Sequence, residues 1–157
     1  MVAFLVWDQA VAGSSPVTST IHAYTTRRPS ATLMAEHNDL GRWGEDLAEA
    51  LLTAKGYTIV ERNCRIARHE VDIIAVDGDT YVFVEVKTRN YNHLVAPRYA
   101  VDTDKMRSLR LAASAFAKKY RLHHPIRFDI ISVVGSPESN LEPNIEHTEN
   151  AFDPLLL

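Results

Sequence analysis

The clearest pattern along the chain is a pair of apolar stretches on either side of Asp77-Gly78. In the second stretch, three valines at alternate positions from 82 to 86 are interleaved with Tyr81 and Phe83. An Asp-Gly pair between alternating hydrophobic residues is typical of a β-hairpin. Because both faces of the second strand carry large apolar residues, we expect both faces to be covered.

Three charged residues interrupt this hairpin. Glu85 and Lys87 are two positions apart, so they share the face that carries Phe83. A four-residue loop at 77–80 would place Asp72 directly opposite Glu85, whereas a two-residue loop would place Asp72 opposite Phe83. Either loop leaves the two carboxylates and the lysine on one face.

Charges in covered strands are costly unless they are paired or bound to a metal. Directly opposed Cβ atoms lie about 4.5–5.5 Å apart, close enough for two carboxylates to hold one hard cation. Mg²⁺ or Mn²⁺ would then bind Asp72 and Glu85, with the backbone carbonyl of Val86 as a third ligand. Lys87 would orient a nucleophilic water or stabilise a pentavalent phosphoryl transition state. The alternative is an ordinary hairpin whose Asp, Glu and Lys line a solvated face.

The rest of the pattern predicts two helices and three more strands. Asn38 or Asp39 can cap a helix that runs to about Lys55 and ends at Gly56. A second helix is expected over 104–120, and strands are expected over 57–62, 126–134 and 145–151. The order α-β-β-β-α-β-β favours an α/β sandwich around a mixed sheet. The apolar stripes predicted to face the core are Leu40, Gly44, Leu47, Leu51 and Ala54 in the first helix, and Met106, Leu109, Ala113, Phe116 and Tyr120 in the second.

Composition adds bounds on the class of protein. The chain has 157 residues, of which 46% are hydrophobic and 24% charged, as expected for one globular domain. The single cysteine, Cys64, excludes an internal disulfide and a cysteine-based zinc site, and we expect an unreactive thiol in a reducing cytoplasm. No apolar run reaches the length needed to span a membrane, so no membrane partner is expected.

Charge is distributed unevenly. The net charge of −3 argues against a generic nucleic-acid binder. However, residues 87–121 hold nine basic and two acidic side chains, and residues 136–157 hold five acidic and no Lys or Arg. The basic segment follows the Glu85-Lys87 strand and is predicted to bind the phosphate backbone of a nucleic acid, with DNA favoured over RNA. The alternative is that these charges belong to a helix face that is simply exposed to solvent. The candidates are Arg89, Arg98, Lys105, Arg107 and Arg110.

The first 33 residues do not fit the pattern and are expected to be disordered. A signal peptide would need a basic start, and Asp8 interrupts the short apolar stretch. The run from Ala12 to Thr18 can be encoded by a frame through the T arm of a transfer RNA gene. We therefore expect residues 1–33 to be a disordered or non-native extension, with translation beginning at Met34 and one domain over 34–157.

Several motifs together resemble a known family. Asp72 followed by Glu85-Val-Lys87 resembles the PD-(D/E)XK nuclease signature. The wider pattern resembles the YraN-type family of small bacterial proteins, which is related to Holliday-junction resolvases, and it covers nearly all of residues 38–153. The matching segments are Gly41-Arg-Trp-Gly-Glu45, Ala48, Lys55-Gly-Tyr57, Arg62-Asn63, Glu70-Val-Asp72, Phe83-Val-Glu-Val-Lys87-Thr-Arg89, Arg127-Phe-Asp129 and Asn150-Ala-Phe152.

The resemblance implies a restriction-endonuclease-like three-layer sandwich, with a mixed central sheet flanked by helices. It implies that Glu45 is the acidic residue that the first helix contributes to the catalytic set, together with Asp72, Glu85 and Lys87. The sequence departs from the family at His69, where the family usually has glycine. It also has Val71 where the signature's name has proline.

Three functions remain open from the sequence. The first is a metal-dependent endodeoxyribonuclease, a hydrolase acting on DNA with a resolvase-like preference for structure. Symmetric cutting of that kind would call for a homodimer. The second is a non-catalytic nucleic-acid-binding module on the same fold. The third is a protein-interaction accessory that uses the acidic tail as its contact surface.

Overall fold

The computed structural model describes residues 31–91 and 103–153, with side chains described from residue 38 onward. The expected order of elements is confirmed within these ranges. No helix among them is long and apolar enough to cross a membrane. The elements are α1 (Ala31–Ala54), β1 (Thr58–Ile66), β2 (His69–Asp77), β3 (Thr80–Arg89), α2 (Thr103–Tyr120), β4 (Ile126–Val134) and β5 (Asn144–Thr148).

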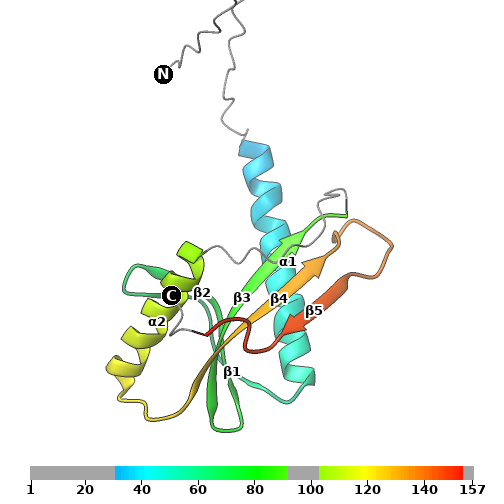
Figure 1. Ribbon diagram of the computed structural model, residues 1–157. Helices are drawn as coiled ribbons and strands as arrows, with labels where there is room; N and C mark the ends of the chain where they lie inside the picture. Colours follow the sequence, from blue (N-terminus) through cyan, green and yellow to red (C-terminus); the bar gives the residue numbers. More distant parts are fainter. Residues whose placement is uncertain (1–30, 92–102, 154–157) are drawn as a thin grey trace, which may run out of the picture.

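The strands form one mixed sheet in the order β1-β2-β3-β4-β5. Only β3 and β4 are parallel, while the other neighbouring strands run antiparallel. Helices α1 and α2 pack on opposite faces of this sheet (Figure 1). The three-layer α/β sandwich expected from the sequence is therefore the observed fold.

Each face of the sheet has its own hydrophobic core, and alternation along β3 divides the two. Phe83 packs with α2 residues such as Phe116, with their ring centroids 5.7 Å apart. Val82 and Val84 face the other way and pack with Ala48 and Leu52 of α1. The predicted assignment of β3 side chains to two covered faces is confirmed.

The β2–β3 hairpin has the register that keeps the two carboxylates opposite each other. Val76 pairs with Tyr81, as the four-residue loop required, and the strands add one more pair, Asp77 with Thr80. Gly78 has φ +61°, a left-handed conformation that glycine adopts at little cost. The register that would have placed Asp72 opposite Phe83 is wrong.

Helix α1 differs from expectation at its start and in its buried stripe. It begins at Ala31, not at Asn38 or Asp39, so it also takes in residues that were assigned to a disordered extension. Ala48 and Leu52 are fully buried, whereas Ala54 is exposed. The predicted stripe is partly confirmed, since Gly44 is buried and Leu47 and Leu51 pack against the core, but the fully buried positions lie one residue further along the helix.

Other predictions were wrong in smaller ways. Strand β1 continues to Ile66 and β5 spans Asn144–Thr148, so both differ from their predicted bounds. Tyr120 is 51% exposed although it was assigned to the core, and its ring lies against Phe116 with centroids 4.6 Å apart. The predictions for residues 1–30, and for Arg98 and the rest of 92–102, lie outside the described residues.

Helix α1 approaches β3 most closely at Gly44. A Cβ atom on Gly44 would lie 1.8 Å from Oγ1 of Thr88 and 2.9 Å from its Cβ. Such contacts are far inside van der Waals distance, so the glycine is required by the close approach of helix and strand. The contact fixes α1 against the strand that carries Glu85 and Lys87.

A buried carboxylate ties β4 to the end of the chain. The Asp129 side chain is fully buried, and its Oδ1 accepts hydrogen bonds from Arg127 Nε at 2.9 Å and from the Asn150 amide at 3.0 Å. Its Oδ2 lies 2.9 Å from Nε2 of His147. Burial alone would raise the pKa of Asp129, but the hydrogen bonds from His147, Arg127 and Asn150 outweigh burial and lower it.

The Gly44 contact predicts that replacing each of two glycines in α1 by alanine has a different effect on the free energy of unfolding. Gly44→Ala should lower the free energy of unfolding by about 1–3 kcal/mol because the added methyl group overpacks the contact with Thr88. Gly41→Ala is the matched control, since nothing lies within 4 Å of its added Cβ. The control should be neutral or gain up to ~1 kcal/mol from helix propensity. Urea unfolding of the two variants checks this, and equal stability of both would contradict it.

The Asp129 network predicts a large loss of stability. Asp129→Ala removes the partner of Arg127 and His147 inside the protein and should cost about 3–5 kcal/mol. Because the folded pKa of Asp129 lies below its ordinary value of 3.8, the wild type holds this contribution above that pH. It loses the contribution as the pH falls through the folded pKa. Asp79→Ala, at an exposed turn position, is the control in urea unfolding at pH 7 and pH 3.

Candidate functional site

The site lies where β2 separates from β3. The ladder between these strands ends at the pair Ile73 and Val84. One step beyond, the Val86 amide donates a 2.8 Å hydrogen bond to Oδ2 of Asp72. A carboxylate side chain thus takes the place that the backbone of β2 would occupy in a continuing ladder.

Strand β2 also turns about its axis at this point. Residues two apart on a strand normally share a face. Yet Val71 packs in the core on the α2 side, and Ile73 packs in the core on the α1 side. Asp72 sits at the turn between them, so its carboxylate lies at a fork in the sheet and not on a regular strand face.

Two carboxylates and two lysines meet at the fork. Lys87 Nζ lies 2.9 Å from Oε1 of Glu85, and Lys105 Nζ lies 2.8 Å from Oε2 of the same carboxylate. Lys105 Nζ also lies 3.9 Å from Oδ1 of Asp72. The Glu85 side chain is 5% exposed, so it is the most deeply buried of the four. The structure brings together Asp72, Glu85 and Lys87, as predicted, and adds Lys105 from α2.

The electrostatics of the fork favour a bound proton or a bound cation. Burial, and then the negative charge of Glu85, raise the pKa of Asp72 to about 7, although the Val86 amide and Lys105 oppose the rise. Burial would lower the pKa of Lys105, but its contact with Glu85 and the charge of Asp72 outweigh burial and raise it. The carboxyl pair therefore resists carrying two negative charges without compensation.

The donors at the fork fit a hard divalent cation that takes oxygen ligands. Oε2 of Glu85 is buried, and its partner among the described residues is the Lys105 ammonium, 2.8 Å away, with no further hydrogen bond from those residues. Among the side chains that the structure describes, no three from His, Cys, Asp and Glu gather as a metal site. A cation here would thus need a backbone oxygen and water in addition to the two carboxylates.

The Val86 carbonyl is oriented to supply that backbone oxygen. The Tyr81 amide and the Arg89 carbonyl both bond toward β4 and its end, so odd-numbered residues of β3 direct their backbone groups to that side. Val86 is even-numbered, and its amide bonds to Asp72 on the β2 side. In a strand the N–H and C=O of one residue point the same way, so the Val86 carbonyl points into the fork.

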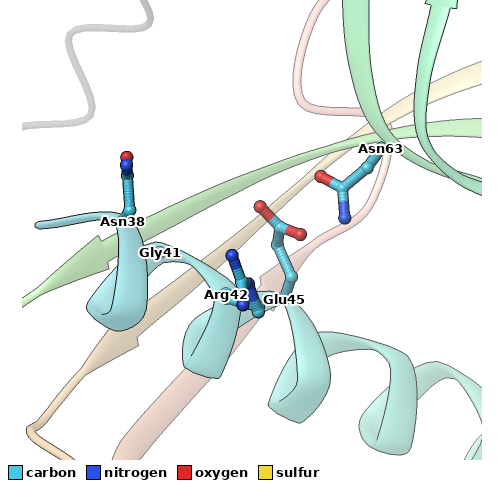
Figure 2. A pocket seen from close by; sticks show the side chains of 5 residues that line it. All are labelled: Asn38, Gly41, Arg42, Glu45 and Asn63. Atoms are coloured by element: carbon cyan, nitrogen blue, oxygen red, sulfur yellow. The ribbon is translucent and has the colours of Figure 1, made fainter. Parts of the chain in front are cut away.

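Glu45 lies beside this group and has a different partner. Its Oε2 lies 4.0 Å from Arg62 and is buried without a hydrogen bond from the described residues. Figure 2 shows Glu45 and Asn63 pointing toward one another across a pocket of about 350 Å³. The lining residues are Asn38, Gly41, Arg42, Glu45 and Asn63.

The pocket adjoins the fork through strand pairing. Arg62 pairs with Ile73 and Cys64 pairs with Val71, which leaves Asn63 opposite Asp72. Asn63 has φ +48°, so the irregularity of β2 at Asp72 has a counterpart in β1. Glu45 is therefore a neighbour of the fork on the α1 side, not a contact of the two lysines.

The departure at His69 has a structural explanation. His69 is the first residue of β2, and its Nδ1 lies 2.8 Å from Oγ of Ser108 on α2. This contact holds the end of the β1–β2 hairpin against the helix that carries Lys105. A glycine at this position would lack the contact.

The other residues predicted to contact nucleic acid do not join the charged group at the fork. Arg89 and Arg107 are exposed, and Arg110 is half-buried with an Nε that no described group hydrogen-bonds. Cys64 is buried, and burial raises the pKa of its thiol to about 11, which fits the expected unreactive residue. Helix α2 thus places one basic side chain in the fork and leaves others near its outer face.

Sequence reasoning missed the contacts of Lys105 and the pocket. Lys105 was assigned a role by charge alone, while its position could have been inferred from topology. A helix that connects two parallel strands begins near the carboxyl end of the first strand, which is where Glu85 and Lys87 lie. Arg42 and Asn63 lie in segments that match the family, but nothing in the sequence indicated the irregular backbone at Asn63.

The fold and the fork define an α/β protein with paired carboxylates and lysines where two inner strands of a mixed sheet separate. The chain belongs to the family described as "Uncharacterised protein family UPF0102", whose model matches residues 44–133. It is 46% identical over 124 residues to a UPF0102 protein of Porphyromonas gingivalis, covering 79% of this chain and 90% of the relative. A Geobacter metallireducens UPF0102 protein is 45% identical over 122 residues, covering 76% and 98%.

The raised pKa of Asp72 predicts that stability depends on pH with a definite sign. A carboxyl group whose folded pKa lies above its ordinary value binds protons more tightly when folded, so stability falls as the pH rises from about 4 to about 7. Each pKa unit of difference corresponds to roughly 1.4 kcal/mol. Asp72→Asn should therefore gain stability relative to wild type between pH 4 and pH 8, measured by urea unfolding in the presence of a chelator. A constant difference between the two proteins across this range would contradict the assignment.

Proposed function

We propose that the protein is a metal-dependent nuclease that hydrolyses phosphodiester bonds in DNA. The observation that carries the proposal is the desolvated pair of Asp72 and Glu85 at the fork, with the Val86 carbonyl on the same side of β3 as the Val86 amide and with Lys87 beside Glu85. Such a pair is costly for folding, and a structural role alone gives no reason to keep it. The resemblance of Asp72, Glu85 and Lys87 to the PD-(D/E)XK signature supports the same chemistry.

A divalent cation held by Asp72, Glu85 and the Val86 carbonyl would supply a bound water of lowered pKa and neutralise charge on the phosphate. The carboxylates orient that ligand set, because the Val86 amide fixes Asp72 and the surrounding core fixes Glu85. Lys87 is 39% exposed and lies on the same face, so its ammonium can donate a hydrogen bond to a phosphate oxygen or hold the attacking water. Hydrolysis adds that water across one P–O bond and releases a hydroxyl and a phosphate monoester.

Glu45 and the basic residues have supporting roles in this proposal. Glu45 lies across the pocket from Asn63, which stands opposite Asp72, so it can act through the solvent that fills the pocket. Arg89, Arg107 and Arg110 would contact the phosphate backbone that leads away from the fork. A preference for branched DNA, and the homodimer needed to cut two strands symmetrically, rest on the resemblance to resolvases.

The test is cleavage by the full chain of labelled linear, nicked and four-way-junction DNA, and of RNA, with Mn²⁺, Mg²⁺ or a chelator. Wild type should cut only with metal. Asp72→Asn, Glu85→Gln and Lys87→Met should each lower the rate at least about 100-fold, because each removes a group from the reacting centre. The substrate that is cut fastest defines the preference among these structures.

The matched control is Lys118→Met, which removes an exposed lysine from the last turn of α2 and should cut like wild type. Absence of cleavage under every condition, with DNA bound equally by wild type and variants, would instead support a binding module on this fold. Absence of both cleavage and DNA binding would contradict both of these functions and would support the third, an accessory protein that acts through protein–protein contacts.

A further inference from the structure

Lys105 occupies the position between the two carboxylates. Its Nζ is 2.8 Å from Oε2 of Glu85 and 3.9 Å from Oδ1 of Asp72, whereas Lys87 forms its ion pair with Oε1 of Glu85. A cation that bridges Asp72 and Glu85 needs one oxygen from each. The Lys105 ammonium lies against those oxygens, and the Lys87 ammonium lies on the far oxygen.

The charge balance gives this position a consequence. Asp72 and Glu85 carry two negative charges when ionised, and Lys87 and Lys105 carry two positive charges. With both carboxyl groups ionised the group is neutral without a metal, and a divalent cation would change its charge to +2. A site of that charge attracts a phosphodiester, and the lysine nearest the cation is repelled from it.

We propose that Lys105 is a resident counter-ion that the metal displaces and that, once displaced, binds a phosphate of the substrate. The proposal rests on the nuclease function proposed above and extends it to the order in which the site assembles. Lys105 holds the carboxylate pair together in the metal-free protein and lowers the cost of their repulsion. Displacement then frees one ammonium near the fork for the DNA backbone, so metal binding and DNA binding strengthen each other.

Helix α2 is suited to such a movement of Lys105. Lys105 lies in the first turn of α2 and its side chain is 27% exposed, so the ammonium can leave the fork by rotation of its own bonds. The helix itself stays anchored, because Leu109, Ala112 and Ala113 are buried against the sheet and Ser108 contacts His69. No movement of the backbone is needed.

The first measurement is the affinity of the full chain for Mn²⁺ alone, by titration calorimetry. If Lys105 competes with the cation, Lys105→Met should bind Mn²⁺ at least about fivefold more tightly than wild type, and Lys118→Met should match wild type. Lys105→Arg, which keeps the positive charge, should bind no more tightly than wild type, and urea unfolding of each variant checks that it is folded. Equal or weaker binding by Lys105→Met would overturn the inference.

The second measurement uses the unaltered protein. The Lys105 amine should react slowly with an acylating reagent in a chelator, because it is held against Glu85. It should react at least about fivefold faster once Mn²⁺ displaces it, as followed by mass spectrometry of the Lys105 peptide. Lys118 should react equally in both conditions. An unchanged rate at Lys105 with Mn²⁺ bound would contradict displacement.

The third measurement is affinity for a phosphorothioate duplex that resists hydrolysis, with Mn²⁺ and in chelator. Mn²⁺ should increase the affinity of wild type about fivefold or more, and Lys105→Met should show a smaller increase. In Mn²⁺, the duplex affinity of Lys105→Met should depend less steeply on salt concentration than that of wild type, by the equivalent of about one phosphate contact. An equal increase in both proteins would overturn the role of Lys105 in phosphate binding.

The outcomes separate this inference from the proposed function. If wild type does not bind Mn²⁺, the nuclease proposal fails and so does this one. If wild type binds Mn²⁺ and cuts DNA while Lys105→Met shows neither tighter metal binding nor a smaller gain in DNA affinity, only the role of Lys105 fails.

Discussion

The hydrogen bond from the Val86 amide to the Asp72 carboxylate is the constraint on which the site depends. It satisfies a backbone donor that would otherwise lie unpaired where two strands separate. In doing so it holds a carboxylate at the plane of the sheet, beside Glu85. The rotation of β2, the positive φ of Asn63 and the direction of the Val86 carbonyl all belong to the same local arrangement. Where the pairing of β2 with β3 ends, backbone geometry thus holds polar groups together.

Topology then brings the second lysine to this place. Parallel strands β3 and β4 require a crossover, and α2 is the helix of that crossover. Its first turn lies near the carboxyl end of β3, so Lys105 meets Glu85 although 20 positions separate them in the sequence. The same geometry explains why the rest of α2 packs as an ordinary amphipathic helix, with Leu109 and Phe116 in the core. Only its beginning takes part in the site.

Most of the fold could be predicted from the sequence, because alternation along β3 and the Asp77-Gly78 turn act locally. Strand β4 was predicted with its observed bounds, Ile126–Val134, since a long apolar run between turns allows few alternatives. The start of α1 was missed because a favourable cap at Asn38 does not prevent a helix from beginning earlier. The Asp72, Glu85 and Lys87 cluster followed from register, whereas Glu45, Arg62 and Asn63 meet through a backbone irregularity that no sequence period encodes.

Asp72, Glu85, Lys87 and Lys105 all come from one contiguous stretch of about a fifth of the chain, and three successive elements, β2, β3 and α2, hold them. Because packing in the two cores positions these elements, a substitution in either core can shift a charged group at the fork without altering a residue of the fork itself.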